Sequence, residues 1–213
     1  LGAAFIHPFD DEEVIAGQGT IGKEILDDHK DPIEAIFVPV GGGGLLAGIG
    51  AYIKTVRPNI KLIGVEPENA AGLKAALDAN RRVVLKEVGT FVDGAAVKQV
   101  GKITFSIIKE WIDEVITVSI DEICAAVEDI FHETRTISEP AGALALAGLK
   151  KVVKARGWKQ KNIIAINSGA NLNFDRLSHI VERVQLGKNK EILLNVCIEE
   201  KEGSFRRFCR DLG

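Results

Sequence analysis

The sequence contains no methionine, one tyrosine, two tryptophans and three cysteines among its 213 residues. The cysteines, Cys124, Cys197 and Cys209, are odd in number and widely spaced, and none belongs to a C-x-x-C pair. This pattern argues against a disulfide scaffold or a zinc cluster and predicts reduced thiols. Methionine is missing even from position 1, so we expect the sequence to be a piece of a longer protein without its N-terminal part.

A strong charge of one sign is also lacking. Lysine and arginine number 27 against 30 aspartates and glutamates, a net charge of −3, and no basic block occurs. We therefore expect no nucleic-acid partner. The longest uncharged run, Ala35 to Ile53, contains Pro39 and six glycines and does not predict a membrane-spanning helix, so we expect no membrane partner. With 46% hydrophobic and 27% charged residues, the composition is that of a globular protein.

Two catalytic motifs are missing as well. The four histidines are scattered, without the H-E-x-x-H spacing of a zinc hydrolase, and we predict no metal site. No G-x-S-x-G sequence occurs, which argues against an α/β-hydrolase.

Short apolar runs alternate with amphipathic segments along most of the chain. Expected strands are Ala35–Val40, Lys61–Glu66, Glu114–Val118 and Asn162–Asn167. Expected helices are Leu45–Val56, Ala70–Ala79, Phe105–Ile112, a helix from a capping box at Ser119 to about Arg135, a helix from Pro140 to near Arg156 capped by Gly157, and a helix from about Phe174 to Gln185. This alternation predicts an α/β fold, with a mostly parallel open sheet and helices on both faces.

The composition changes after Gly187. A polar stretch, Lys188 to Glu191, precedes an expected strand, Ile192–Ile198, and an amphipathic segment, Phe205–Leu212. We therefore predict one unit over residues 1–187 and the incomplete start of a second module over residues 188–213.

Four consecutive glycines, Gly41 to Gly44, lie between an expected strand and helix. This order places bare backbone N–H groups at the positive end of a helix, where phosphate binds. Glycine also permits positive φ and keeps a Cβ away from the anion. No Gly-Lys-Ser/Thr follows, so the loop is not a P-loop, and its spacing is not a distinctive dinucleotide fingerprint. The alternative is a flexible turn.

Ligands of parallel sheets bind beyond the carboxyl ends of the strands. Ser168 follows an expected strand there, and its hydroxyl is suited to hydrogen-bond a heterocycle nitrogen, or simply to cap a tight turn. Glu139 precedes Pro140 and small residues that allow close approach of a ligand; the alternative is an acid that favours a helix N-terminus.

Three further segments have weaker signals. Asp93-Gly94 and Gly17 to Thr20 are small, polar loop or helix-start segments that either line a pocket or form turns. Glu66 lies at the end of an expected strand. An acid at this position either faces a ligand or a metal or, more commonly, is exposed to solvent.

The stretches VPVGGGGLLAGI, EPAGALALAGLKK, NSGANLNF and IAGQGTIGKEIL resemble pyridoxal-phosphate enzymes of the tryptophan-synthase-β fold type, and among them the biosynthetic threonine ammonia-lyases (threonine dehydratases). The resemblance extends over the whole chain. NVCIEEKEGSFRRFC resembles the start of an ACT-like regulatory domain. Serine racemases and serine dehydratases share the glycine loop but usually lack that tail, and they remain the alternative, as does a non-catalytic fragment.

The resemblance implies a role for each matching position. The backbone N–H groups of Gly41, Gly42, Gly43, Gly44 and Leu45 would bind the phosphate of pyridoxal 5′-phosphate. Ser168 would pair with the pyridine nitrogen, and Glu139 and Gly94 would lie near the ring. A serine racemase cation site has acids at the positions of Glu66 and Gly72, and the glycine leaves that site incomplete here.

The family's Schiff-base lysine, in a Ser-Phe-Lys type context, and its ring-hydroxyl asparagine match no residue of this chain and would precede residue 1. The implied reaction is β-elimination from L-threonine or L-serine, with threonine giving 2-oxobutanoate and ammonia in the first step of isoleucine biosynthesis. The resemblance further implies an amino-acid substrate, an allosteric amino acid (isoleucine or valine), a homotetramer, and a cytoplasmic or, in a plant, plastid location.

Overall fold

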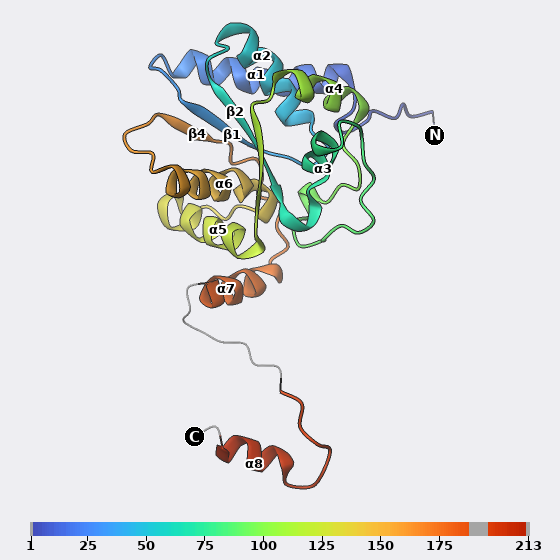
Figure 1. Ribbon diagram of the computed structural model, residues 1–213, viewed down its shortest axis with the longest axis vertical. Coiled ribbons are helices and arrows are strands. Elements are labelled where there is room, and N and C mark those ends of the chain that lie inside the picture. Colours follow the sequence, from blue (N-terminus) through green and yellow to red (C-terminus); the bar gives the residue numbers. More distant parts are fainter. Residues whose placement is uncertain (1, 188–195, 212–213) are drawn as a thin grey trace.

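A computed structural model describes residues 2–187 and 196–211 (Figure 1). Helices and strands alternate through most of the chain, as the sequence pattern predicts. In chain order they are α1 (Glu12–Asp28), β1 (Ala35–Pro39), α2 (Gly44–Val56), β2 (Lys61–Pro67), the 3-10 turn η1 (Glu68–Ala70), α3 (Gly72–Asp78), the 3-10 turn η2 (Asp93–Ala95), α4 (Lys102–Trp111), β3 (Glu114–Val118), α5 (Ile120–Thr134), α6 (Pro140–Arg156), β4 (Ile163–Ala165), α7 (Arg176–Gly187) and α8 (Ser204–Asp211).

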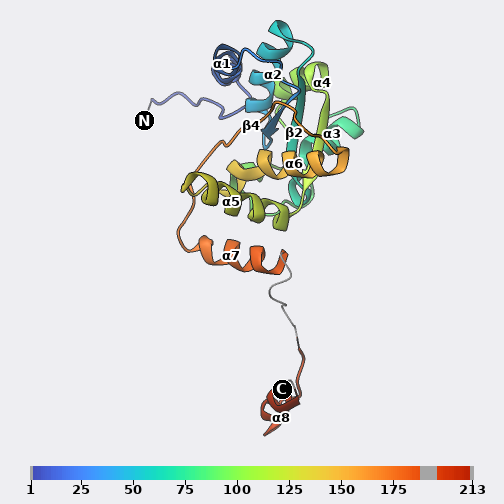
Figure 2. The same cartoon turned by 90° about the vertical axis from the view of Figure 1, so that its left-hand side faces the viewer.

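The four strands form one sheet in the order β3-β2-β1-β4, and every pairing in it is parallel. Figure 2 shows α1, α2 and α4 on one face of the sheet, and α6, then α5, then α7 on the other. The predicted α/β fold with an open parallel sheet is confirmed. Because all strands point the same way, the segments after β1 and β4 meet at the same edge.

Both faces of the sheet are buried, and neighbouring residues of β1 serve different cores. Ala35 and Phe37 pack in a cluster with side chains of α5 and α6. Ile36 and Val38 pack in a second cluster with side chains of α1 and α2. This division follows from the alternation of side chains along a strand, and it explains why the strand is apolar throughout rather than at every second position.

The predicted caps of two helices are present. Ser119 Oγ accepts a hydrogen bond from Glu122 N (3.2 Å), and Glu122 Oε2 accepts one from Ser119 N (2.8 Å), which is a complete capping box for α5. Gly157 ends α6 in the left-handed region, with φ of +61°.

Residues Gly17 to Thr20 lie in the middle of α1, so their interpretation as a loop or helix start is wrong. Asp11 caps this helix by accepting hydrogen bonds from Glu13 N and Val14 N. A Cβ at Gly19 would lie 3.1 Å from Gly48 O of α2. The glycines therefore allow α1 and α2 to pack closely, a reason that local sequence does not reveal.

The interpretation of Glu66 as an exposed strand-end acid is also wrong, since the residue is 1% exposed. Its carboxylate oxygens accept hydrogen bonds from Leu73 N (2.7 Å) and Lys74 N (2.8 Å) and so cap α3. Burial raises the pKa of Glu66 to about 7, while these backbone hydrogen bonds act in the opposite direction.

Helix α4 begins at Lys102, three residues before its predicted start. The Asp10 carboxylate accepts hydrogen bonds from Lys102 N and Ile103 N, both at 2.7 Å. This cap comes from a distant part of the chain, so no local pattern predicts it.

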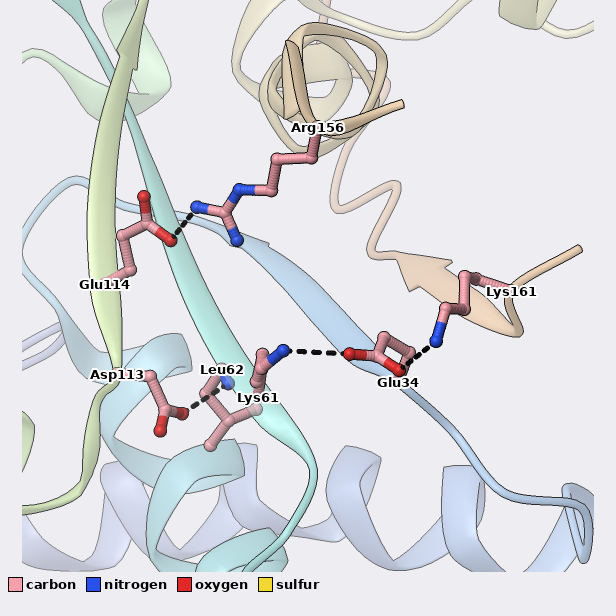
Figure 3. A network of polar contacts seen from close by, with 7 residues as sticks. All are labelled: Glu34, Lys61, Leu62, Asp113, Glu114, Arg156 and Lys161. Carbon is pink, nitrogen blue, oxygen red and sulfur yellow. Dashed lines mark hydrogen bonds and ion pairs between the residues drawn. The ribbon is translucent and has the colours of Figure 1, made fainter. Parts of the chain in front are cut away.

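Charged side chains join the elements at the amino ends of the strands (Figure 3). Glu34, just before β1, pairs with Lys61 of β2 (2.8 Å) and with Lys161 before β4 (2.9 Å). Arg156 at the end of α6 pairs with Glu114 at the start of β3.

The C-terminal part is described only in pieces. The predicted strand Ile192–Ile198 lies largely outside the described residues, and residues 196–198 have no regular secondary structure. The amphipathic segment forms α8, in which no residue is buried, and Figure 1 shows this helix apart from the α/β body. No helix in the described ranges is long and apolar enough to cross a membrane.

Candidate cofactor site

The glycine run forms the turn between β1 and α2, at the carboxyl edge of the sheet. Gly43 is the N-cap of α2 and has φ of +95°, a conformation that favours glycine strongly over residues with a Cβ. The first turn of α2 contains no acidic residue. The positive end of the helix dipole is therefore not offset by a carboxylate within that turn.

Hydrogen bonds to its carbonyl groups hold the glycine turn in place. Gly42 O accepts from Gly101 N (3.1 Å) and from Thr104 Oγ1 (2.8 Å), and Gly43 O accepts from Ala47 N (2.9 Å). Helix geometry gives the first N–H groups of α2 no partner within the helix. Anchored carbonyls and free amides at a helix N-terminus suit a phosphate.

The glycines are also required by close packing. A Cβ on Gly41 would lie 3.1 Å from Ala95 Cα, and one on Gly42 would lie 2.2 Å from Cγ of Phe9. A Cβ on Gly43 would lie 2.9 Å from Cδ1 of Ile108. The turn is thus closely packed against its neighbours, a packing that a simple flexible turn does not require.

Gly94 and Glu139 meet beside this turn. Gly94 belongs to η2, and a Cβ there would lie 3.7 Å from Glu139 Oε1 and 2.9 Å from Cβ of Ala141. Since Gly94 O lies 3.4 Å from the Cβ position of Gly41, η2 links the glycine turn to the start of α6. The sequence-predicted residues Gly41, Gly94 and Glu139 therefore share one edge of the sheet.

The loop after β4 completes this group. A Cβ on Gly169 would lie 2.0 Å from Glu139 Oε1, and Gly169 O accepts a hydrogen bond from Glu139 N (3.1 Å). Ser168 precedes Gly169 in the loop and is exposed. The loop with Ser168 and the acid Glu139, far apart in sequence, are thereby joined at the carboxyl edge of the sheet.

Glu139 is the N-cap of α6, but its side chain makes no capping hydrogen bond. Burial, and then the negative charge of Asp93, raise the pKa of Glu139 above its ordinary value. Asp93 itself forms an ion pair with Arg176 at the start of α7 (3.4 Å). The Glu139 carboxyl group thus lies beside the glycine-lined turn and holds a proton more readily than an ordinary glutamate, and its role toward a ligand stays a prediction.

Local sequence patterns missed several residues that build this edge. Phe9, Thr104 and Ser138 contact the glycine turn or the Ser168 loop from distant segments. Thr104 and Ser138 are buried polar residues, and no motif singles them out. Over the described ranges, no group of three or more histidine, cysteine, aspartate or glutamate side chains is arranged to hold a metal ion.

Comparison with known proteins identifies the family of the chain. Residues 1–169 match the family described as "Pyridoxal-phosphate dependent enzyme". The L-threonine dehydratase biosynthetic of Burkholderia multivorans is 52% identical over 212 residues, which cover 100% of this chain and 42% of that protein. The chain thus spans about two fifths of the length of this curated relative.

Solved structures share the fold. The processed form of threonine deaminase isoform 2 from Solanum lycopersicum superposes with a TM-score of 0.84 at 47% identity, covering 86% of this chain and 53% of that one. Serine racemase from Dictyostelium discoideum superposes with a TM-score of 0.72 at 38% identity, covering 79% and 53%. The family match covers most of the chain and includes the glycine turn, Gly94, Glu139 and Ser168, and the chain belongs to the family of pyridoxal-phosphate-dependent enzymes.

Proposed function

We propose that this chain acts in the pyridoxal-phosphate-dependent β-elimination of L-threonine, and of L-serine, with threonine giving 2-oxobutanoate and ammonia. The observation that carries the proposal is the meeting of the glycine turn, Glu139 and the Ser168 loop at one sheet edge. The 52% identity to a biosynthetic threonine dehydratase supports it. The Schiff-base lysine would come from a segment outside this chain, and "complete enzyme" below means the chain together with that segment.

The residues of the glycine turn fit the phosphate group of the cofactor. The N–H groups of Gly41 to Gly44 and of Leu45 would hold the phosphate oxygens, with the α2 dipole adding to the attraction. The bonds from Thr104 and Gly101 to Gly42 O keep the turn from rearranging. This residue set therefore binds and orients the cofactor without a basic side chain.

Ser168 would hydrogen-bond the pyridine nitrogen. When bound, the cofactor supplies an electron sink for the substrate's α-carbon. A neutral hydroxyl does not hold a proton on the ring nitrogen as an aspartate would, which favours elimination over transamination. Glu139 and Gly94 would border the ring. The raised pKa of Glu139 means that it holds a proton more readily than an ordinary glutamate, and Gly94, without a side chain, would leave room for the ring.

A second candidate is a serine racemase or serine dehydratase activity. The serine racemase from Dictyostelium discoideum supports this candidate, because it shares the fold of this chain with a TM-score of 0.72 at 38% identity. The relative from Burkholderia multivorans matches the chain over its full length, including the part after Gly187, and this favours the threonine reaction.

The rest of the proposal concerns the whole protein. Residues 188–213 would begin an ACT-like regulatory module that binds isoleucine or valine, and the enzyme would be a homotetramer in the first step of isoleucine biosynthesis. The exposed, amphipathic helix α8 supports a module that continues beyond the described residues, because its apolar side chains Phe205 and Phe208 need a partner. The location, cytoplasm or plastid, stays a prediction.

An assay for 2-oxobutanoate tests the proposal. We expect the complete enzyme to have a higher kcat/KM for threonine than for serine, and to release ammonia with the 2-oxo acid. The 213 residues alone, with excess cofactor, should show no turnover. They should also associate in light scattering, because surface that the lysine-bearing segment would cover would be open to solvent. Turnover of the chain alone within tenfold of the complete enzyme would contradict the placement of the lysine, and racemised serine as the main product would favour the second candidate.

A further inference from the structure

Ser138 is a buried hydroxyl residue, 2% exposed, immediately before Glu139. Neither the glycine turn nor the proposed role of Ser168 accounts for it. A buried hydroxyl is unfavourable unless it is hydrogen-bonded, so its partners show what it holds in place.

The Ser138 hydroxyl faces the loop that follows β4. It donates a hydrogen bond to Asn167 Oδ1 at 2.7 Å, and it also lies 3.0 Å from Gly169 O and 3.2 Å from Glu139 O. A hydroxyl has one proton to donate at a time, and the shortest contact is the one to Asn167. The hydroxyl therefore binds the residue before Ser168 and lies next to the carbonyl oxygen of the residue after it.

The loop is fixed at the same place by the start of α6. Glu139 N donates to Gly169 O (3.1 Å). A Cβ on Gly142 would lie 2.4 Å from Gly169 O and 2.5 Å from Ser138 Oγ, so only glycine at this position lets the loop approach the helix so closely. Ser168 lies between two anchored neighbours, although it is itself exposed.

We propose that Ser138 is a positioning residue for the cofactor: by holding the Asn167 side chain, next to a Gly169 that the Glu139 amide holds, it places the Ser168 hydroxyl opposite the pyridine nitrogen. This inference rests on the proposed function, because it needs Ser168 to face that nitrogen. Ser138 touches neither cofactor nor substrate and acts only through the loop. Replacing it by alanine frees the Asn167 side chain and leaves Gly169 O with the Glu139 amide.

The first experiment follows the loop itself in the complete enzyme, without cofactor. We expect Ser138→Ala to raise the amide hydrogen exchange of Glu139, whose N–H donates to Gly169 O, by about tenfold, with little change elsewhere. Asn167→Ala, a change at an exposed side chain that leaves no hole in the core, should have the same effect in smaller degree. Ser178→Ala is the control, since its hydroxyl donates to the backbone oxygen of Asp175 at an exposed position of α7, away from the loop.

The second experiment follows the cofactor in the complete enzyme. Ser138→Ala should shift the absorption and fluorescence of the bound cofactor in the same direction as Ser168→Ala, and lower kcat by about threefold to tenfold with KM nearly unchanged. The double variant Ser138→Ala/Ser168→Ala should be no slower than Ser168→Ala, because the first residue acts through the second. A residue that merely stabilised the fold would lower the rate in the double variant as well.

The outcomes separate the two claims. If Ser168→Ala changes the spectrum and kcat while Ser138→Ala and Asn167→Ala change neither, the inference about Ser138 is wrong and the role of Ser168 stands. If Ser168→Ala leaves both unchanged, the proposed role of Ser168 is wrong, and the inference about Ser138 is overturned with it. If Ser138→Ala does not fold, Asn167→Ala decides by the same readouts.

Discussion

The two edges of the parallel sheet are built from different chemistry. At the amino edge, long charged side chains join neighbouring elements: Glu34 pairs with Lys61 and Lys161, and Arg156 pairs with Glu114 (Figure 3). At the carboxyl edge, glycines and backbone hydrogen bonds do the joining. Ion pairs tie the strands without close backbone contact, whereas glycines bring the backbone close enough for its own N–H groups to serve a ligand.

Two glutamates show the same contrast. Hydrogen bonds from Lys61 and then from Lys161 lower the pKa of Glu34 to about 2. Burial and the nearby Asp93 raise the pKa of Glu139. The first carboxylate is stabilised in its charged form by dedicated partners. The second has no such partner among the residues that the structure describes, and it borders the proposed cofactor ring. An acid left without structural partners at the ligand edge is available for the ligand.

The largest expected effect is a loss of catalytic rate on substitution of Ser168. In the complete enzyme, Ser168→Ala should lower kcat by roughly 10-fold to 1000-fold, the range of one lost polar stabiliser, while the cofactor remains attached. Ser168→Asp should increase side transamination, because the acid would hold a proton on the ring nitrogen. Steady-state rates and product analysis measure both, and a wild-type kcat for Ser168→Ala would mean that Ser168 only forms the turn.

Gly43→Val should have the second largest effect, a loss of cofactor affinity. The substitution places a side chain at a position with φ of +95°, next to the amides that would hold the phosphate. Its Cβ alone would lie 2.9 Å from Ile108 Cδ1. We expect cofactor affinity in the complete enzyme to fall more than tenfold, about 1.4 kcal/mol or more, and stability to fall as well.

Gly157→Val separates these two effects. It places the same side chain at φ of +61°, at the end of α6, with no atom within 4 Å of the Cβ position. It should cost about 1–2 kcal/mol of stability but leave cofactor affinity unchanged. Equal losses of affinity in both variants, by fluorescence titration, would show that strain rather than the phosphate turn is responsible.

The carboxyl edge was partly predictable from sequence. The glycine turn and Ser168 follow from the rule that ligands bind beyond strand ends. Glu139 follows from its place before Pro140 and small residues that allow close approach of a ligand. Ser138 and Thr104 were not predictable, because a serine or threonine becomes a partner of a distant loop only once the fold is formed. Their burial is the signal, and burial is a tertiary property.

The fold shows the same limit. Strands β1 to β3, the capping box at Ser119 and the Gly157 cap depend on neighbouring residues and were predicted within one or two positions. Helix α1 was missed because its glycines have low helix propensity and are required by contact with α2. The start of α4 was missed because Asp10, far away in sequence, caps it.

The opposite pKa shifts predict opposite pH dependences of stability. Glu34 has a lowered pKa, so its contribution is present above its ordinary pKa of 4.5 and is lost as pH falls toward about 2. Glu139 has a raised pKa, so its contribution is fully present below 4.5 and is lost as pH rises through the raised value. Glu34→Gln should remove the first dependence and Glu139→Gln the second, in urea unfolding of the complete enzyme from pH 2 to 8. Unfolding midpoints that respond to pH identically in both variants would contradict the contrast between the edges.

The smallest effect is expected at the amino edge. Arg156→Gln removes the ion pair with Glu114, in which both side chains are 36% exposed, together with a cation–π contact to Trp158 at 5.4 Å. Such partly exposed pairs contribute about 0–1 kcal/mol, so the loss in unfolding free energy should stay below about 1 kcal/mol and shrink further in high salt. Cofactor affinity in the complete enzyme should not change, since Arg156 lies at the far edge of the sheet from the glycine turn. A tenfold loss of affinity in Arg156→Gln would mean that the charged edge supports the ligand edge through the strands, and the two edges would then have to be treated as one site.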